Sequence, residues 1–415
     1  MKKIRRIAIV GGGSSGWLAA AYLNYNFPDY DITIIDKEIG TPVGVGEATL
    51  LNFKLFLKNC GFEVEEWFDE MDATEKLGIY FHNWVDNNKH VYHPFYTRLT
   101  EAKKYKDQLM QRLDDLSNVA YHVNCGKLVL FLQRKLKNKI TFKKSAVKEV
   151  VYKDDNIDTL ILNNKQKVSA DLYVDCTGFN SILKNKTEKI MLRDRLICDT
   201  AVAGQVEYKN KEKELVPYTK CEAVKEGWVW SIPVSSRIGS GFIFNRDITS
   251  IDQAKDFFVK HWKNRIKKEN LKVIDWTPYY DKKIWNGNVV SIGLSAGFLE
   301  PLESTGLMLA MEGIYSLCKR IFKKSFNEED IDLYNQHMKI FYENSIDFVN
   351  MHYLVSKRKG IFWEKGRQLK ASKKFKLFKK DVLNKNYTDL AENVFFNDTD
   401  CFISDNWYCW LKQTL

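Results

Sequence analysis

Ile7-Ala8-Ile9-Val10-Gly11-Gly12-Gly13-Ser14-Ser15-Gly16 is the stretch that decides the fold of this 415-residue chain. An apolar run leads directly into glycines spaced G-x-G-x-x-G, and helix-forming residues follow at 17–23. A strand, a glycine turn and a helix in this order are typical of a dinucleotide-binding unit. Gly11 permits the tight turn, Gly13 lets the backbone approach a pyrophosphate, and Gly16 allows the helix to pack closely on the strand.

The residues around this turn strengthen the prediction. Ser14 and Ser15 stand at the start of the expected helix, where a phosphate group is favoured. A second expected strand, residues 32–35, ends in Asp36, at the right distance for an acid that holds ribose hydroxyls. A lone glycine turn is a weak signal, but the strand, helix and acid together favour nucleotide binding over a merely structural turn.

Two later segments favour FAD over NAD as the cofactor. Residues 170–179 predict a buried strand that ends in Thr177-Gly178, and residues 288–294 predict another strand that runs into the small residues before Phe298 and Leu299. The latter contains Gly293 and leads to Gly297. Three separated glycine turns at strand ends suit one long, extended cofactor.

Five further motifs carry a family resemblance. They are Val43-Gly44-Val45-Gly46-Glu47-Ala48-Thr49, Lys76-Leu77-Gly78-Ile79, His93-Pro94-Phe95, Gly227-Trp228-Val229-Trp230-Ser231-Ile232-Pro233 and Glu300-Pro301-Leu302-Glu303-Ser304-Thr305-Gly306. Two tryptophans one residue apart before Ile-Pro are especially rare by chance. With these motifs the chain resembles the flavin-dependent halogenases of the tryptophan-halogenase family, from Gly11 to Gly306.

The resemblance implies a reaction. In similar proteins a separate flavin reductase supplies reduced FAD, which with dioxygen converts a halide ion (chloride, bromide or iodide) into hypohalous acid. This electrophile passes through a tunnel to a lysine, matched here by Lys76, and halogenates a small aromatic, indole- or phenol-like substrate. The lysine either donates a hydrogen bond as an ammonium or forms a haloamine as an amine, and the sequence leaves both open.

The same resemblance assigns roles to the other residues. Glu303 stabilises the cationic ring intermediate or accepts its proton, and Ser304 connects that region to the flavin. Thr305 and Gly306 are expected to bind halide. The substrate and tunnel residues are expected to be His93, Pro94, Phe95, Trp228 and Trp230. The residues expected to bind FAD are Gly11, Gly13, Ser14, Ser15, Gly16, Asp36, Gly46, Glu47, Ala48, Gly178, Gly293, Gly297, Phe298 and Leu299.

Each role has a plainer alternative. Most lysines are solvated charges, but the apolar residues 77–81 that follow Lys76 favour catalysis. An acid and a serine at a helix start also describe a simple helix cap, and tryptophans are usually core residues. At the level of the whole chain, an FAD-dependent aromatic monooxygenase or reductase would need neither Lys76 nor the tryptophan pair. A non-catalytic flavin-binding protein is the second alternative.

The predicted fold is α/β, with an FAD-binding Rossmann-like domain of the two-dinucleotide-fold, monooxygenase type. Residues 1–320 form an FAD lobe (about 1–50, 140–185 and 285–320) of parallel strands with helices on both faces, interleaved with substrate segments at about 51–139 and 200–284. Residues 321–415 form a mostly helical cover. This last part departs most from tryptophan halogenases, which suggests that the substrate need not be free tryptophan.

Composition sets the remaining bounds. The net charge is +11, but the lysine excess is scattered and no nucleic-acid-binding motif accompanies it. Eight cysteines show no C-x-x-C spacing, so neither zinc nor any other metal nor a redox pair is indicated, and a reducing cytoplasm fits. No apolar stretch reaches the length of a membrane span. A homo-oligomer is compatible with these features.

Overall fold

A six-stranded sheet organises one part of the fold in the computed structural model, which describes residues 2–37, 46–95, 119–184, 187–384 and 401–415. Its order is β21 (Trp285–Asn286), β22 (Val289–Ser291), β13 (Leu172–Asp175), β2 (Arg6–Val10), β3 (Asp31–Asp36) and β9 (Thr141–Lys144). All neighbouring pairs are parallel except β21 with β22. The carboxyl ends of β2, β3 and β13 therefore meet at one edge, where an open α/β sheet binds its ligand.

The two faces of this sheet are covered differently. Ile7, Ile9 and Ile34 belong to the main core together with α1 (Ser14–Asn26), α5 (Cys125–Leu136) and α8 (Thr305–Arg320). Ala8, Val10 and other residues of the opposite face pack instead against an antiparallel sheet, β10 (Val147–Lys153), β11 (Asn156–Leu162) and β12 (Lys167–Val168). The prediction of helices on both faces is therefore wrong. Leu160 and Leu162 lie on one side of β11 because side chains alternate along a strand, and they supply the covering surface.

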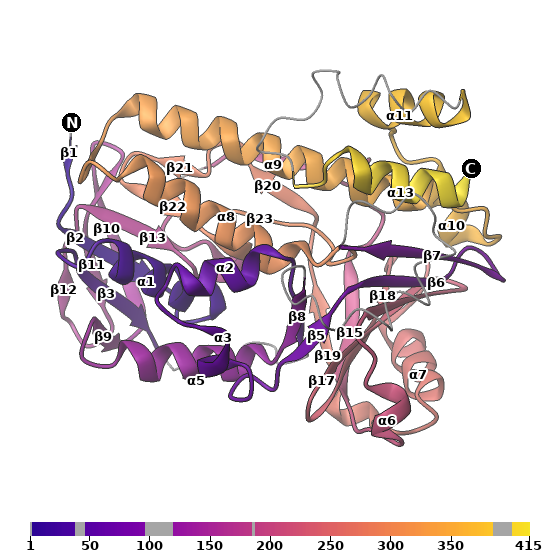
Figure 1. Cartoon of the computed structure of the whole chain (residues 1–415). Coiled ribbons are helices and arrows are strands. Elements are labelled where there is room, and N and C mark those ends of the chain that lie inside the picture. The colour runs from indigo at the N-terminus through magenta and orange to yellow at the C-terminus, as the bar shows by residue number, and fades with distance from the viewer. Residues whose placement is uncertain (1, 38–45, 96–118, 185–186, 385–400) are drawn as a thin grey trace.

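A second, seven-stranded sheet stands beside the first (Figure 1). Its order is β19 (Lys272–Asp275), β15 (Thr200–Val206), β18 (Arg237–Phe244), β17 (Gly227–Val234), β16 (Thr219–Val224), β6 (Gly78–Asp86) and β7 (Lys89–Pro94). Only β16 and β6 pair in parallel. α7 (Ile251–His261) packs on β15 and β18 through Ala254 and Phe258, and the short α6 (Lys211–Glu214) lies nearby.

Small sheets join the two large ones. One has the order β4 (Glu47–Ala48), β8 (Ala120–Val123), β5 (Thr74–Lys76), and another β14 (Lys189–Met191), β20 (Tyr279–Asp281), β23 (Gly297–Phe298). β1 (Lys2–Lys3) pairs with β24 (Ser325–Phe326). Helical pieces complete this region: α2 (Asn52–Lys58), α3 (Val64–Trp67), η2 (Gly178–Asn180), η3 (Lys268–Asn270) and η4 (Gly293–Ser295). β8 therefore pairs with both the strand that carries Glu47 and the strand that carries Lys76, and it lies between them.

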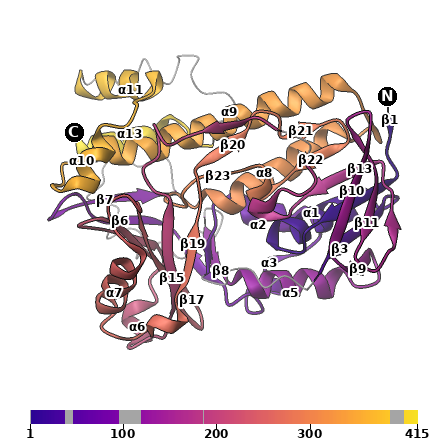
Figure 2. The same ribbon diagram turned by 180° about the vertical axis from the view of Figure 1, so that it is seen from behind.

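Helices cover the top of both sheets in Figure 1 and, from behind, in Figure 2. The long α9 (Glu328–Leu354) packs along α8 and continues over the second sheet, where α10 (Ile361–Arg367), α11 (Lys373–Leu383) and α13 (Ser404–Thr414) follow. α13 lies against β7 and buries Trp407, Trp410 and Leu411. Within the described ranges, no helix is long and apolar enough to cross a membrane.

Candidate active site

The glycine turn after β2 is closed on one side and open on the other. Gly11 has a φ of +109°, and a Cβ there would lie 2.2 Å from the carbonyl oxygen of Cys176. A Cβ on Gly16 would lie 2.0 Å from the carbonyl oxygen of Gly11, so Gly16 lets α1 start close to the turn. A Cβ on Gly13 would meet no atom within 4 Å. The backbone at Gly13 is thus the part that a ligand can approach.

Asp36 stands at the end of the neighbouring strand, β3. Its Oδ2 accepts a hydrogen bond of 2.5 Å from the backbone N–H of Gly12, which holds the carboxylate beside the turn. The side chain borders the same cavity as Gly13. This is the geometry expected of an acid that binds ribose hydroxyls.

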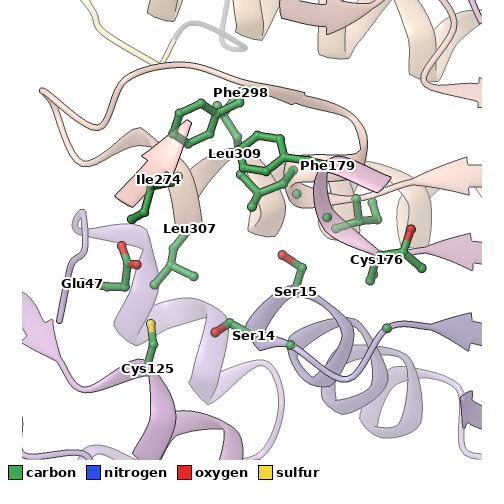
Figure 3. A pocket seen from close by; sticks show the side chains of 18 of the residues that line it. Ser14, Ser15, Glu47, Cys125, Cys176, Phe179, Ile274, Phe298, Leu307 and Leu309 are labelled. Carbon is green, nitrogen blue, oxygen red and sulfur yellow. The ribbon is translucent and has the colours of Figure 1, made fainter. Parts of the chain in front are cut away.

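A cavity of about 650 Å³ begins at this turn. Figure 3 shows Ser14 and Ser15 on one side of it, Glu47 and Cys125 next to them, and Phe179 and Phe298 across from them. Every residue that the sequence assigned to FAD borders this cavity except Gly16, which packs beneath the turn. Val43, Gly44 and Val45 of the second motif lie outside the described residues.

The lining also includes residues that sequence reasoning missed. Cys125 begins α5, and Ile274 and Trp276 come from β19 and the residue after it. No motif marks these positions, because each reaches the cavity only through the packing of its own element. Glu47, which the sequence did assign to FAD, lines the same cavity, and burial raises its pKa to about 7.

Lys76, at the end of β5, is completely buried. Its Nζ donates hydrogen bonds to the carbonyl oxygen of Thr49 (2.8 Å) and to Ser304 Oγ (2.7 Å), and it lies 4.6 Å from the centre of the Phe95 ring. Burial lowers the pKa of this lysine to about 7, although the nearby carboxylate of Glu303 opposes the shift. A buried amine that titrates near neutrality differs sharply from an ordinary surface lysine.

Ser304 connects Lys76 with the cavity. It borders the cavity and, at the same time, its Oγ contacts Lys76 Nζ. The residue adopts a left-handed backbone, with a φ of +61°, immediately before α8. Gly306, the second residue of that helix, borders the cavity, whereas Thr305 is fully buried beside it.

Glu303 is held between two histidines. Its Oε2 lies 2.8 Å from His93 Nδ1, and its Oε1 lies 2.5 Å from His352 Nε2. Burial alone would raise the pKa of Glu303, but the contacts with His93 and His352 outweigh burial and lower it. The carboxylate also interacts with the charge of Lys76, although each of its two oxygens already contacts a histidine. His352, on α9, is a functional candidate that no motif in the sequence marked.

Known proteins of similar sequence and structure identify the family of this chain. A tryptophan halogenase family model matches residues 6–413. Tryptophan 7-halogenase RebH of Lentzea aerocolonigenes is 30% identical over 422 residues, which cover 89% of this chain and 80% of that protein. The chain belongs to the tryptophan halogenase family. The structure of tryptophan 6-halogenase SttH of Streptomyces toxytricini matches with a TM-score of 0.86 and 26% identity, over 99% of this chain and 90% of that one. The flavin-dependent halogenase BrvH of Brevundimonas sp. BAL3 gives 0.86 and 25%, over 100% and 90%.

Membership of this family decides among the three functions that the sequence left open. The protein is a flavin-dependent halogenase, and neither the monooxygenase or reductase alternative nor the non-catalytic alternative is retained. The FAD-binding Rossmann-like fold is likewise that of the solved flavin-dependent halogenases. Enzymes of this family act on small aromatic molecules and depend on a separate flavin reductase.

The two tryptophans of the halogenase motif have different surroundings. Trp230 borders the cavity, and its ring occupies the space that a side chain at position 241 would fill, since a Cβ on Gly241 would lie 2.0 Å from it. Trp228 does not border the cavity. It is fully buried, and its Nε1 donates to the hydroxyl of Tyr353 (3.0 Å), which in turn donates to Glu300 (2.7 Å).

The other predicted substrate residues, His93, Pro94 and Phe95, lie on the side of Lys76 and Glu303 rather than along the cavity. His93 and Pro94 end β7 and Phe95 follows it, and none of the three borders the cavity. Phe95 faces Lys76, whereas His93 faces Glu303. The structure therefore brings Lys76, Phe95, His93, Glu303 and Ser304 together beside the cavity, and of these five only Ser304 borders it.

Proposed function

We propose that this halogenase oxidises halide in the cavity and uses the resulting hypohalous acid at Lys76 to halogenate an indole- or phenol-like aromatic substrate. The observation that carries the proposal is the position of Ser304. It borders the cavity and also binds the buried ammonium of Lys76, so the two regions meet at one side chain.

The residues of the cavity fit FAD. Gly13 and Gly178 leave open space where a Cβ would stand, whereas Gly11 and Gly293, both at positive φ, bring the chain too close to its neighbours for any side chain. The amides at the start of α1 would hold the pyrophosphate, and Asp36 the adenosine ribose. When bound, FAD in its reduced form supplies the reaction with dioxygen that oxidises the halide.

Thr305 and Gly306 are the proposed halide site. Thr305 Oγ1 is buried and makes no hydrogen bond to any residue in the described part of the chain. It is the first residue of α8, a 16-residue helix whose N-terminus favours an anion. A hydroxyl donor and free helix amides next to the cavity suit chloride, bromide or iodide.

Lys76 holds and polarises the hypohalous acid. An ammonium has three N–H donors, and Thr49 and Ser304 occupy two of them. The third can donate to the oxygen of hypohalous acid, which makes the halogen more electrophilic. The aromatic carbon then forms a bond to the halogen as the bond between halogen and oxygen breaks. The leaving hydroxide takes a proton from the Lys76 ammonium and departs as water.

Glu303 completes the substitution, because the ring carbon must lose its own proton to restore aromaticity. The carboxylate is near Lys76 and is held in place by two histidines, so it is positioned to stabilise the cationic ring and to accept this proton. Phe95 offers the ring a stacking partner, and Trp230 separates the substrate from FAD.

Replacing Lys76 with Ala tests the proposal. The enzyme would be given FAD, a flavin reductase, NADH and each halide, and halogen incorporation into indoles and phenols measured by mass spectrometry. We expect the variant to lose organic halogenation, while FAD binding and peroxide release persist. Lys89→Ala is a matched control, because Lys89 is exposed on β7. Oxygenated product from the wild-type enzyme, without halogen, would refute the proposal.

A further inference from the structure

Four side chains from separate parts of the fold form one hydrogen-bonded row. Asn406 of α13 contacts His93 of β7, His93 contacts Glu303, and Glu303 contacts His352 of α9. His93, Glu303 and His352 expose at most 1% of their surface. In such a buried row, each contact requires exactly one hydrogen between its two atoms, so the protonation of every member can be worked out from its neighbours.

The orientation of Asn406 is fixed by its own helix. Its Oδ1 accepts the backbone N–H of Ile403 at 2.9 Å, which places Nδ2 toward His93. Nδ2 lies 3.0 Å from His93 Nε2 and can only donate. His93 Nε2 must therefore be the acceptor and carries no proton. His93 is then neutral, with its one proton on Nδ1, and that proton is donated to Glu303.

His352 is constrained in a different way. Its Nδ1 lies 2.7 Å from the carbonyl oxygen of Phe348, which can only accept, so Nδ1 carries a proton. Its Nε2 lies 2.5 Å from Glu303 Oε1, and this contact needs one more proton, on either atom. Glu303 and His352 therefore share a single mobile proton. His93 keeps its only proton on Nδ1, because moving that proton to Glu303 would leave the ring without a proton.

We propose that Asn406 is a positioning residue of the active site, which locks His93 in the neutral Nδ1–H form and so leaves His352 as the sole proton partner of Glu303. The inference rests on the proposed role of Glu303 as the group that takes up the ring proton. A neutral His93 lowers the affinity of the carboxylate for that proton less than a charged His93 would. The C-terminal helix thus takes part in the chemistry of this enzyme although it lines no part of the FAD cavity.

Nitrogen NMR of the FAD-loaded, full-length protein with 15N-labelled histidine tests the assignment directly. The chain has seven histidines, so each signal can be assigned by single substitutions. We expect His93 to show a protonated Nδ1 and an unprotonated Nε2. In Asn406→Asp the carboxylate still accepts from Ile403 but cannot donate, so His93 should become protonated at both nitrogens. Lys76 and the neutral thiol of Cys221, the other titratable groups near Glu303, are not altered by this substitution.

Steady-state halogenation provides the second measurement. A charged His93 weakens Glu303 as a base, so Asn406→Asp should lower kcat about tenfold with little change in KM for the aromatic probe. Gln413→Ala is the matched control, because Gln413 anchors the same helix to the backbone of Tyr92 without touching His93. It should leave kcat unchanged.

The outcomes separate this inference from the proposed function. A protonated Nε2 on His93 in the wild-type protein, or an equal loss of kcat in Gln413→Ala, would overturn it. The wild-type spectrum alone is decisive if Asn406→Asp does not fold. If the spectrum is as expected but no halogenated product forms with any halide, the role of Glu303 fails while the tautomer assignment stands.

Discussion

The protonation of Lys76 decides how a single residue can activate hypohalous acid. Burial lowers its pKa to about 7, so ammonium and amine are both available in the range where the enzyme can be assayed. The groups around Nζ, a carbonyl oxygen and the face of an aromatic ring, favour the ammonium. A haloamine pathway would instead need the amine, which predominates at higher pH.

We therefore expect halogenation to fall as the pH rises through about 7, because the third N–H donor of Lys76 is lost on deprotonation. The rate should be measured across pH 6–9 at saturating FAD and halide. Peroxide release, recorded in the same samples, serves as the control, since it does not require Lys76. Halogenation that rises with pH while peroxide release stays constant would identify the amine as the active form.

At the scale of elements, α8 carries the proposed halide site on its first turn. Thr305→Val keeps the shape of the side chain but removes the hydroxyl, so we expect KM for halide to rise about tenfold, in line with the loss of one hydrogen bond to a charged ligand. Chloride and bromide titrations of the halogenation rate measure this. Thr305→Ser, which keeps the hydroxyl, is the matched control, and a KM unchanged in both variants would remove Thr305 from the site.

Elements also show what the sequence could predict. The β2–turn–α1–β3 unit is local, because Gly11, Gly16 and Asp36 lie within 26 residues of each other and their roles follow from spacing. The antiparallel sheet on the opposite face is not predictable in this way, because its residues are far in sequence from the strands that they cover. Leu160 and Leu162 in β11 alternate as in any half-buried strand, and only their packing on Ala8 and Val10 reveals which surface they cover.

The same distinction applies to the candidate site. Lys76, Glu303 and Ser304 could be named from motifs, and the structure brings them together. Asn406 and His352 could not, because they lie in ordinary amphipathic helices and meet Glu303 or His93 only through contacts that span 49 and 313 residues. Predicting them requires the docking of α9 and α13, which no local pattern encodes.

At the scale of the whole molecule, the FAD cavity and the C-terminal helix are separate. The last residue along the chain that borders the cavity is Leu309. The ring centre of Trp410, on α13, lies 3.9 Å from that of His352 and 4.6 Å from that of Phe81. Trp410 is fully buried. A defect in α13 should therefore reach the chemistry at Glu303 without reaching the flavin.

Trp410→Ala should accordingly lower halogenation at least about tenfold while the Kd for FAD stays the same, because His352 loses the ring that holds it against Glu303. Its loss of stability, about 3–5 kcal/mol, should be matched by Trp285→Ala, which empties an equally buried position on β21, away from Lys76. Flavin fluorescence gives the affinity, urea unfolding the stability, and mass spectrometry the product formed per folded molecule. If Trp285→Ala lowers halogenation as much as Trp410→Ala, the loss comes from general destabilisation and α13 has no specific part in the reaction. If Trp285→Ala leaves halogenation high, the loss in Trp410→Ala is specific to α13, whose Trp410 and Asn406 contact His352 and His93. A helix outside the FAD cavity then controls the proton chemistry at Glu303.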